Sequence, residues 1–225
     1  MNGSPPFNAV QGALELALGP LVGISITNPC VKNHNLWPEE EPAIARAVPK
    51  RKLEFSAGRT AIRNAMRSIG LPECAVPVAS DRTPILPDTI VGSISHTDTI
   101  CAAAVGNSTD WRGIGIDLEI CSPMDDNIIQ TVLTTSERAQ LDLLEPAQQS
   151  IAVLRIFSAK ECAFKAQYAM TKAIFGFECM QITLSQDTFQ ARFCNDFAPF
   201  QTGDVLIGTS AIVGDHVVST VKIPH

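Results

Sequence analysis

Two helical segments, each followed by a run of short strands, limit most strongly what this chain can fold into. The first covers residues 55–69, where apolar residues recur at helical spacing, and the second extends from after Pro123 to about residue 173. Strand-like runs bounded by turn residues accompany both helices. These runs are residues 21–27 before the first helix, 90–96, 100–106 and 112–120 after it, and 178–184, 188–194, 205–213 and 216–223 after the second. The order predicts an α+β fold.

The chain divides near residues 112–125 into two halves of similar size. We expect an N-terminal lobe of residues 1–112 and a C-terminal lobe of residues 113–225, packed as one compact unit. A ligand cleft is expected where the two lobes meet.

Two connections have a recognisable character. Residues 71–90 are rich in proline, which predicts a long surface connection rather than a helix. The last two strands are joined by Gly214 and Asp215, which predict a hairpin turn.

Composition and charge exclude several classes of protein. With 225 residues, of which 45% are hydrophobic, the chain can bury a sizeable core. The formal net charge of -6 argues against general nucleic-acid or anionic-membrane binding, because both require an excess of Lys and Arg. The seven cysteines include no C-x-x-C pair, so a zinc site or a disulfide framework has little support.

The N-terminus and the hydropathy predict the location. The segment "MNGSPPFNAV" lacks the basic and apolar regions of a secretory leader. No stretch approaches the ~18 apolar residues of a membrane span. We therefore expect a cytoplasmic protein with reduced thiols.

Basic residues are concentrated around the start of the first helix. Seven of the 17 Lys and Arg residues lie between residues 46 and 67, against a single acid, Glu54. Arg59, Arg63 and Arg67 fall at i, i+4 and i+8, so their guanidinium groups share one helix face without a carboxylate between them. This stripe is either a solvated surface or a site for a multiply charged anion.

The stretch "GIGIDLEI" places two carboxylates on one face of a predicted strand. Because alternate residues point to opposite faces, Asp117 and Glu119 lie together with Gly113 and Gly115. Two residues of strand separate their Cα atoms by about 7 Å, so both carboxylates can reach one cation. The glycines leave a bare backbone beside the acids, which permits close approach of a ligand. An acidic solvent-exposed face is the alternative.

The stretch "FSAKECAFK" admits two interpretations of Glu161. Ser158 and Glu161 have the S-x-x-E spacing of a capping box, in which both side chains satisfy backbone N–H groups at a helix start. Alternatively, Glu161 joins the two strand acids, and three hard oxygen ligands favour Mg²⁺ with water and phosphate completing the shell. Lys160 and Lys165 would then face the same phosphate.

Four blocks resemble the phosphopantetheinyl transferases of the surfactin-activating type, and more closely their enterobactin-synthase branch. They are "RKLEFSAGRTAIR" (51–63), "VGSISH" (91–96), "GIGIDLE" (113–119) and "FSAKECAFKA" (157–166), with "RTPILP" (82–87) before the second. Their joint order and spacing over residues 51–166 is specific. Residues 1–45 and 180–225 carry little recognisable signal.

The resemblance implies a monomer of two pseudo-symmetric α+β lobes with coenzyme A in the cleft between them. It implies Mg²⁺-dependent transfer of 4'-phosphopantetheine from coenzyme A to a serine of an apo acyl or peptidyl carrier protein. Adenosine 3',5'-bisphosphate is the implied second product. Siderophore or other non-ribosomal peptide synthesis is the pathway associated with the branch.

The resemblance also assigns roles to individual residues. Asp117, Glu119 and Glu161 match the metal ligands, and Glu161 is also a candidate base for the incoming serine. Lys160 and Lys165 match the diphosphate contacts, and Lys165 is counted with Glu161 as catalytic. The positions expected to hold coenzyme A, particularly its 3'-phosphate, are Arg51, Arg59, Arg82, Ser95 and His96.

The sequence departs from the family pattern at one position, and two other classes of protein are alternatives. Thr83 stands where some members have a lysine before Pro84, so the phosphate contact of this loop comes from Arg82 or is absent. A metal-dependent phosphodiesterase also combines Asp, Glu and Lys, but its usual lysine position, two residues after the glutamate, holds Ala163. A non-catalytic module would keep the coenzyme A pocket and bind carrier proteins without transfer, although all three acids and both lysines are present.

Overall fold

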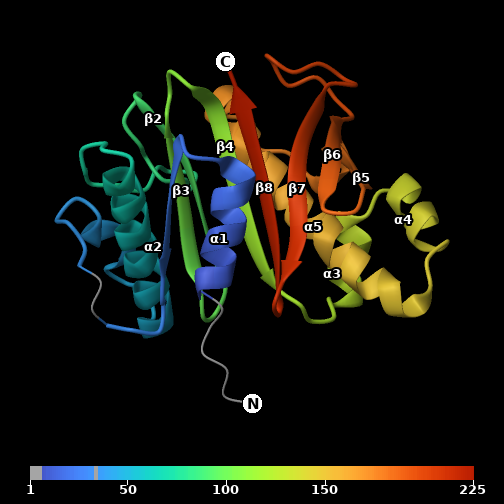
Figure 1. The fold of residues 1–225 in the computed structure, drawn as a ribbon, viewed down its shortest axis with the longest axis horizontal. Helices are drawn as coiled ribbons and strands as arrows, with labels where there is room; N and C mark the ends of the chain where they lie inside the picture. Colours follow the sequence, from blue (N-terminus) through green and yellow to red (C-terminus); the bar gives the residue numbers. More distant parts are fainter. Residues whose placement is uncertain (1–6, 33–34) are drawn as a thin grey trace.

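The chain folds into two antiparallel sheets and five α-helices, as the computed structural model of residues 7–32 and 35–225 shows (Figure 1). The α-helices are α1 (Phe7–Leu18), α2 (Pro49–Ser68), α3 (Asp126–Val132), α4 (Thr135–Leu141) and α5 (Pro146–Thr171). Two short 3₁₀ helices are η1 (Glu41–Ile44) and η2 (Phe177–Cys179). The predicted α+β fold is confirmed. The expectation about the leader falls in part on residues 1–6, which lie outside the described residues.

The strands are arranged in a three-stranded and a five-stranded sheet. The first sheet has the order β1 (Val22–Thr27), β3 (Cys101–Asn107) and β2 (Ile90–His96). The second has the order β4 (Trp111–Ile120), β8 (His216–Pro224), β7 (Val205–Val213), β6 (Thr188–Phe193) and β5 (Met180–Leu184). Every predicted strand is present within about two residues at each end, which is the usual uncertainty of strand boundaries.

The helices differ more from prediction than the strands do. Helix α2 begins at Pro49, six residues before the predicted start, because a proline at the first helical position fits the helix without losing a hydrogen bond. Helix α1 was not predicted, although its buried residues Val10, Leu14 and Leu18 recur every four residues. The long helical segment after Pro123 is divided into α3, α4 and α5.

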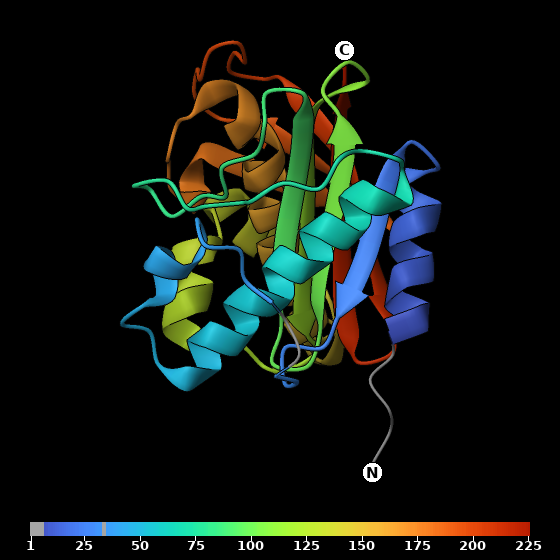
Figure 2. The ribbon, with the colours of Figure 1, turned by 90° about the vertical axis from the view of Figure 1, so that its left-hand side faces the viewer.

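Helices cover the sheets in layers. Helix α1 lies on one face of the five-stranded sheet, against β7 and β8, and α5 lies on the opposite face (Figure 1). Helix α2 crosses the face of the three-stranded sheet (Figure 2). Each half of the chain therefore places one long helix, α2 or α5, on its own sheet.

The two sheets meet along β2 and β4 through two buried serines. The hydroxyl oxygen of Ser93 accepts a hydrogen bond from the backbone N–H of Ile116 at 3.1 Å, and that of Ser95 accepts one from Leu118 at 3.2 Å. These hydroxyls take the place of carbonyl groups in a backbone ladder. The strand that ends in His96 is thereby held beside the strand that carries the acids.

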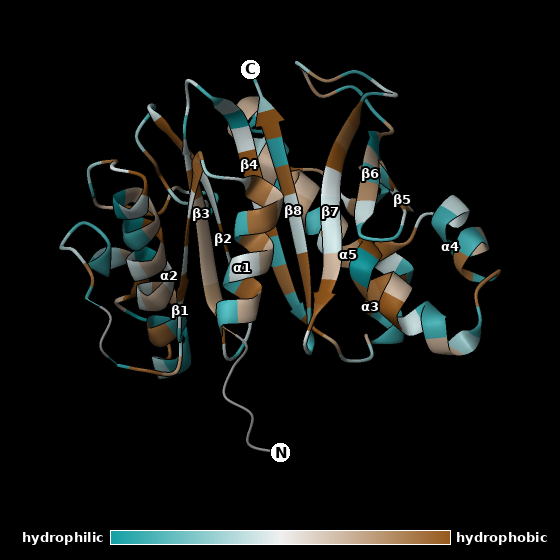
Figure 3. Cartoon of the chain, viewed as in Figure 1, coloured by the Kyte–Doolittle hydropathy of each residue, from teal (hydrophilic) through white to brown (hydrophobic). Residues whose placement is uncertain are grey.

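Apolar residues form a core shared by both halves, a core between α2 and the three-stranded sheet, and a core beneath α5. The shared core joins Leu14 of α1 and Ile24 of β1 to Ile116 of β4 and Val218 of β8, so it crosses the predicted boundary at residue 112. In Figure 3 the hydrophobic residues gather in the strands and in α1, whereas α4 carries many hydrophilic residues.

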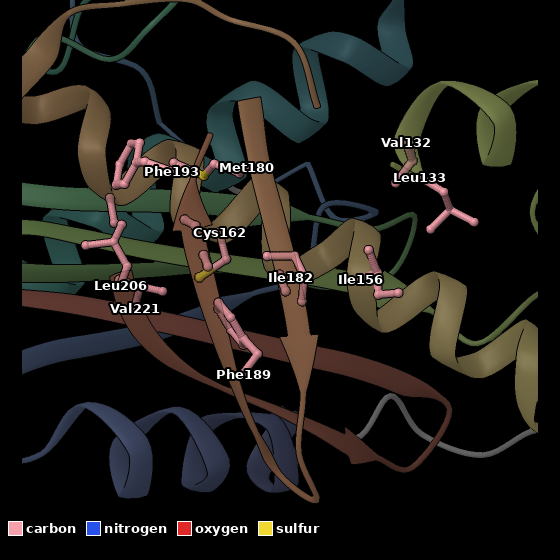
Figure 4. Packing of buried hydrophobic residues seen from close by; sticks show 14 of the residues in the cluster. Val132, Leu133, Ile156, Cys162, Met180, Ile182, Phe189, Phe193, Leu206 and Val221 are labelled. Atoms are coloured by element: carbon pink, nitrogen blue, oxygen red, sulfur yellow. The ribbon is translucent and has the colours of Figure 1, made fainter. Parts of the chain in front are cut away.

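The core beneath α5 lies between this helix and the strands β5 to β8. Cys162 of the helix, Ile182 of β5, Phe189 of β6 and Val221 of β8 are all nearly inaccessible to solvent (Figure 4). This packing fixes α5 along its length, including the residues next to the candidate site.

The two predicted connections are confirmed. Gly214 adopts a φ of 63° in the turn between β7 and β8, a left-handed conformation that suits glycine. Between α2 and β2 the described chain has no helix and only an isolated bridge between Val78 and Pro84. Among the described residues, none of the helices combines the length and the apolar character that crossing a bilayer requires.

Candidate functional site

Two glycines of β4 bring α5 against the strand. A Cβ atom at Gly115 would lie 2.0 Å from the carbonyl oxygen of Cys162, and one at Gly113 would lie 2.1 Å from that of Ala166. The thiol of Cys162 donates to the carbonyl oxygen of Gly115 at 3.2 Å. The expectation that the bare backbone admits a ligand is therefore wrong, because the glycines admit the helix. The close contact places Glu161 beside the acids of β4.

The capping-box interpretation of Glu161 is also wrong. Helix α5 begins at Pro146, so Ser158 lies in its interior, where its hydroxyl donates to that of Ser219 at 2.9 Å. The capping box of this region belongs to α4, where Thr134 and Glu137 satisfy each other's backbone N–H groups. The carboxylate of Glu161 is free of any cap function.

Asp117 and Lys165 form the centre of the site. The ammonium nitrogen of Lys165 lies 2.6 Å from Oδ1 of Asp117 and 3.3 Å from the carbonyl oxygen of Ile116. The hydroxyl of Ser95 donates to the same Oδ1 at 3.1 Å. Asp117 is 2% exposed, and its second oxygen, Oδ2, has no hydrogen-bond partner among the described residues.

Burial and neighbouring carboxylates raise the pKa of Glu119 and of Glu161. Burial and the neighbouring carboxylate of Asp117 raise the pKa of Glu119 to about 7. Burial raises the pKa of Glu161 as well, with Asp117 adding to the effect and Lys165 opposing it. Burial acts to lower the pKa of Lys165, but Asp117 and Glu161 together outweigh it, so that pKa is raised. Carboxylates that lie close together in a partly buried site repel one another when ionised, and a bound cation would offset this repulsion.

The donor set fits a divalent cation. The His, Cys, Asp and Glu side chains of the described residues include no group of three already gathered as metal ligands. Nevertheless, a buried carboxylate oxygen without a donor is unfavourable, and Oδ2 of Asp117 is in that state. Asp117, Glu119 and Glu161 provide the carboxylate oxygens that Mg²⁺ prefers, and the pKa values of Glu119 and Glu161 are raised by carboxylates beside them.

The ammonium group of Lys160 is hydrogen-bonded within the protein, which argues against the expected diphosphate contact of this residue. Its ammonium group donates to the carbonyl oxygens of Val132 at 2.7 Å and Phe177 at 2.9 Å and to Glu137 at 2.8 Å. The side chain of Lys160 is 2% exposed and that of Glu137 is inaccessible. Burial lowers the pKa of Lys160, and Glu137 opposes the effect. All three protons of the Lys160 ammonium group are donated to acceptors within the protein.

A large cleft lies beside the acids and is lined by residues of both halves of the chain. Its volume is about 800 Å³. Helix α2, the connection that follows it, β2 and α5 all contribute to its walls. The cationic residues that line the cleft are Arg51, Arg59, Arg82, Arg112, Lys165 and Lys172, against the acids Glu54 and Asp88. The cleft therefore offers local positive charge in an acidic protein.

Arg59 is the most deeply placed of these cations. It is 6% exposed, its Nε donates to the carbonyl oxygen of Val76 at 2.6 Å, and its guanidinium carbon lies 4.0 Å from the centre of the Phe55 ring. Burial lowers its pKa to about 10, so it stays charged at neutral pH. The guanidinium group is thus oriented before any ligand binds.

The other two arginines of the predicted stripe are neutralised within the protein. Arg63 lies 2.5 Å from the buried carboxylate of Glu40, and Arg67 lies 2.7 Å from Glu73. The stripe therefore does not act as one anion site, because carboxylates from segments outside α2 pair with two of its three guanidinium groups. Arg59 alone of the three lines the cleft.

Arg51 and His96 meet at the wall of the cleft. Their side-chain nitrogens are 3.3 Å apart, and Glu54 lies 3.5 Å from Arg51 and 4.0 Å from His96. Burial lowers the pKa of His96, and Glu54 opposes this effect. The structure thus brings Arg51, His96 and Arg59 to one cleft.

Ser95 does not line that cleft, although it was expected to hold coenzyme A. It is buried, and its hydroxyl is used by Asp117 and by the amide of Leu118. Ser95 therefore orients the acid rather than exposing a donor to the cleft.

A smaller pocket of about 230 Å³ lies next to the cleft. It is bounded by the pair Lys160 and Glu161 and by apolar side chains of α5 and the segment that follows. The apolar residues are Phe164, Phe175, Phe177 and Met180. Phe164 lines both the pocket and the cleft, so the two are neighbours.

Sequence reasoning missed Arg112, Tyr168 and Lys172, which also line the cleft. Arg112 directly precedes the "GIGIDLE" block, and its position at the start of β4 was available as a signal. Lys172 ends α5 with a φ of 53°, which no sequence pattern indicated.

Comparison with known proteins gives a consistent result along most of the chain. Residues 39–106 match the model of the 4'-phosphopantetheinyl transferase N-terminal domain, and residues 113–221 match the model of the 4'-phosphopantetheinyl transferase superfamily. The two matched segments meet close to the predicted boundary between the lobes.

Individual relatives agree with the family models. The 4'-phosphopantetheinyl transferase Svp of Streptomyces mobaraensis is 37% identical over 160 residues, covering 70% of this chain and 65% of its own. The 4'-phosphopantetheinyl transferase Npt of Nocardia iowensis is 34% identical over 173 residues, covering 74% and 77%. Enterobactin synthase component D of Escherichia coli (strain K12) is 36% identical over 146 residues, covering 62% and 66%. The match thus spans slightly less than two thirds of Svp and of the enterobactin component.

Proposed function

This chain belongs to the 4'-phosphopantetheinyl transferase superfamily, and on that premise we propose that it transfers 4'-phosphopantetheine from coenzyme A to a serine of an apo acyl or peptidyl carrier protein. Adenosine 3',5'-bisphosphate is the second product. The observation that supports the proposal most strongly is the ion pair of Asp117 and Lys165, which has Glu119 and Glu161 as neighbours and joins the acids to a cation-lined cleft through Lys165.

Coenzyme A binds in the cleft through its phosphate groups. Its charge requires local cations, because the protein as a whole is acidic. Arg59, Arg51 and His96 form the group that we assign to the 3'-phosphate, with Arg59 held in orientation by Val76. Arg82 reaches the same cleft from the connection after α2.

Asp117, Glu119 and Glu161 hold a divalent cation, which we propose is Mg²⁺. When bound, it supplies positive charge that neutralises the diphosphate and stabilises the leaving group. Lys165 faces the diphosphate from α5, where its pairing with Asp117 fixes the position of the ammonium group. Ser95 holds Asp117 in place through the hydroxyl group.

Glu161 is the residue that we assign as base for the incoming serine. Its raised pKa brings the carboxyl closer to neutral pH, where a group can both accept and release a proton. The serine oxygen forms a bond to the β-phosphorus of coenzyme A while its proton passes to Glu161. The bond from that phosphorus to the bridging oxygen breaks, and the electron pair leaves with adenosine 3',5'-bisphosphate.

The small pocket beside Glu161 suits the pantetheine arm. The arm is a mainly uncharged chain, and Phe164, Phe175 and Phe177 offer it an apolar surface. The pocket adjoins the cleft at Phe164, so one molecule can extend from the cleft into it.

The kind of carrier protein that accepts the group is also part of the proposal. A relative is named enterobactin synthase component D, which associates the branch with siderophore synthesis. We propose a peptidyl carrier of such a pathway as the partner, acting with this chain as a monomer in the cytoplasm.

A single assay separates transfer from binding alone. Release of adenosine 3',5'-bisphosphate is measured in mixtures of the protein, coenzyme A, Mg²⁺ and an apo peptidyl carrier domain. Transfer predicts nucleotide release only when both coenzyme A and the carrier are present. A non-catalytic module would bind coenzyme A and release none, and a phosphodiesterase would release nucleotide without the carrier.

A further inference from the structure

The connection between α2 and β2 carries a small hairpin that is closed by its own hydrogen bonds. Val78 and Pro84 form an isolated antiparallel bridge. Within it, the amide of Ala79 donates to the carbonyl oxygen of Thr83, and the amide of Arg82 donates to that of Ala79, both at 2.9 Å. The hairpin therefore has a defined shape in a segment with no helix or ladder strand of its own.

Asp81 joins this hairpin to α5. Its Oδ1 accepts hydrogen bonds from the amide of Thr83 at 3.0 Å and from the hydroxyl of Thr83 at 2.6 Å. Its other carboxylate oxygen, Oδ2, accepts a hydrogen bond from the hydroxyl of Tyr168, which is 87 residues away in the chain. One side chain therefore connects the loop of the N-terminal half to the helix of the C-terminal half.

Arg82 occupies a conformation that requires such support. Its φ is 71°, in the left-handed region that favours glycine and that a bulky residue adopts at a cost. The bonds of Ala79, Thr83 and Asp81 surround it on both sides and hold the turn.

The hairpin and Tyr168 line the same cleft. Arg82, Thr83 and Pro84 contribute from the connection, and Tyr168 and Lys172 contribute from the end of α5. Figure 2 shows the connection after α2 extending towards the side where α5 lies. The contact between Asp81 and Tyr168 therefore joins two walls of the proposed coenzyme A cleft.

Tyr168 contacts the cation Lys172 and the acid Asp81, which precedes Arg82 in the chain. Its ring lies 5.5 Å from the ammonium nitrogen of Lys172, and its hydroxyl holds the acid that directly precedes Arg82. Neither Arg82 nor Lys172 takes part in a salt bridge within residues 7–32 and 35–225, so both charges are available to an anion.

We propose that Tyr168 and Asp81 form a latch that holds the 78–84 hairpin at the cleft and so positions Arg82 against a phosphate group of bound coenzyme A. Tyr168 and Asp81 are positioning residues, because they act through Arg82 and Lys172 and hold no phosphate themselves. The identity of the ligand rests on the proposed function, whereas the latch itself does not.

The latch is tested first without any ligand, by hydrogen exchange of the backbone amides of Ala79, Arg82 and Ile85. These three amides are hydrogen-bonded within the connection, the last one to Pro77, so their protection reports its closure. Tyr168→Phe and Asp81→Asn are expected to speed their exchange by about fivefold or more. The control Asp110→Asn changes an exposed acid outside the cleft and should leave them unchanged.

The second readout is substrate use in the complete transfer reaction. Each latch variant should raise the KM for coenzyme A by about fivefold and leave kcat nearly unchanged, since the reacting phosphate is held elsewhere. The double variant should be no worse than Asp81→Asn alone, because Asp81→Asn already opens the contact that Tyr168→Phe removes. A merely structural role would lower the melting temperature without this division between KM and kcat.

The results of these experiments test the latch and the proposed function separately. Unchanged amide exchange in both variants would overturn the latch, and so would additive effects of the two changes on KM. If the wild-type protein neither bound nor used coenzyme A, the proposed function would fail, and the exchange rates would still decide whether Tyr168 holds the hairpin. Loss of kcat with KM unchanged would show that Tyr168 acts on the reaction and not on the hairpin.

Discussion

The ammonium group of Lys165 lies 2.6 Å from Oδ1 of Asp117, and this ion pair joins α5 to β4. This ion pair depends on the close approach of helix and strand at Gly115. It also explains how a buried acid next to other carboxylates is stabilised before a metal ion binds. The contact between α5 and β4 is therefore the structural basis of the proposed site.

Gly115→Ala should damage both stability and transfer. The added Cβ would lie 2.0 Å from the carbonyl oxygen of Cys162, so α5 would have to move away from β4. Such overpacking typically costs about 1–3 kcal/mol, and the same movement would separate Lys165 from Asp117. Thermal melting and transfer rates would be measured together.

The matched control is Gly12→Ala in α1. Nothing lies within 4 Å of a Cβ at Gly12, so the change should be neutral or stabilise by up to about 1 kcal/mol. If Gly115→Ala behaved like Gly12→Ala, the close contact of α5 with β4 would not be required.

Lys160→Met should unfold the protein at a lower temperature by leaving Glu137 buried without its partner. Removing one partner of a buried ion pair typically costs about 3–5 kcal/mol. Lys50→Met is the control, because Lys50 pairs with Asp98 at the exposed surface, where such pairs contribute about 0–1 kcal/mol. Normal stability with a raised KM for coenzyme A would instead place Lys160 at the diphosphate.

The raised pKa of Glu119 should make the stability of the protein depend on pH. Its pKa is raised from 4.5 to about 7, so the folded state binds this proton more tightly than the unfolded state. The contribution of protonated Glu119 to the free energy of unfolding is fully present below about pH 4.5 and is lost as the pH rises through about 7. The full shift corresponds to about 3 kcal/mol, which partial exposure of the side chain reduces to about 1–2 kcal/mol.

Melting temperatures of the metal-free wild type and of Glu119→Gln at about pH 5.5 and about pH 8 measure this effect. The wild type should lose stability relative to Glu119→Gln as the pH rises. Added Mg²⁺ should restore the melting temperature of the wild type at the higher pH and should change that of Glu119→Gln less. Parallel curves for the two proteins, with or without Mg²⁺, would contradict the assignment of Glu119 as a ligand.

Arg59→Ala should impair the use of coenzyme A but not of dephospho-coenzyme A. A hydrogen bond to a charged group contributes about 1.5–3 kcal/mol, and only coenzyme A carries the 3'-phosphate assigned to Arg59. Arg67→Ala is the control, since Arg67 lies on the same helix but pairs with Glu73 outside the cleft. Equal impairment of Arg59→Ala with both substrates would refute the assignment.

The sequence predicted the strands better than the helix boundaries. Apolar alternation and turn residues located every strand, because both signals are local. The capping-box interpretation of Ser158 and Glu161 was wrong because both residues lie inside α5, which begins at Pro146. Local spacing does not reveal whether a helix has already begun.

The errors at the site have a common physical cause. Lys160 is neutralised by Glu137, and Arg63 by Glu40, through contacts between residues 23 positions apart in each case. A sequence shows which charges are neighbours along the chain, but not which distant carboxylate the fold brings to them. Likewise, Gly115 was correctly recognised as a place of close approach, while the approaching group was α5.

The most direct test is the intact mass of apo carrier proteins after incubation with this protein, coenzyme A and Mg²⁺. A panel of apo peptidyl and acyl carrier proteins would be used, with wild type and Glu161→Gln compared at equal concentration. We expect one carrier to gain a single phosphopantetheine group on a serine with the wild type. Loss of one preorganised electrostatic contact costs about 3 kcal/mol, so Glu161→Gln should be slower by about a hundredfold or more. A wild-type protein that binds coenzyme A and leaves every carrier mass unchanged would contradict the account.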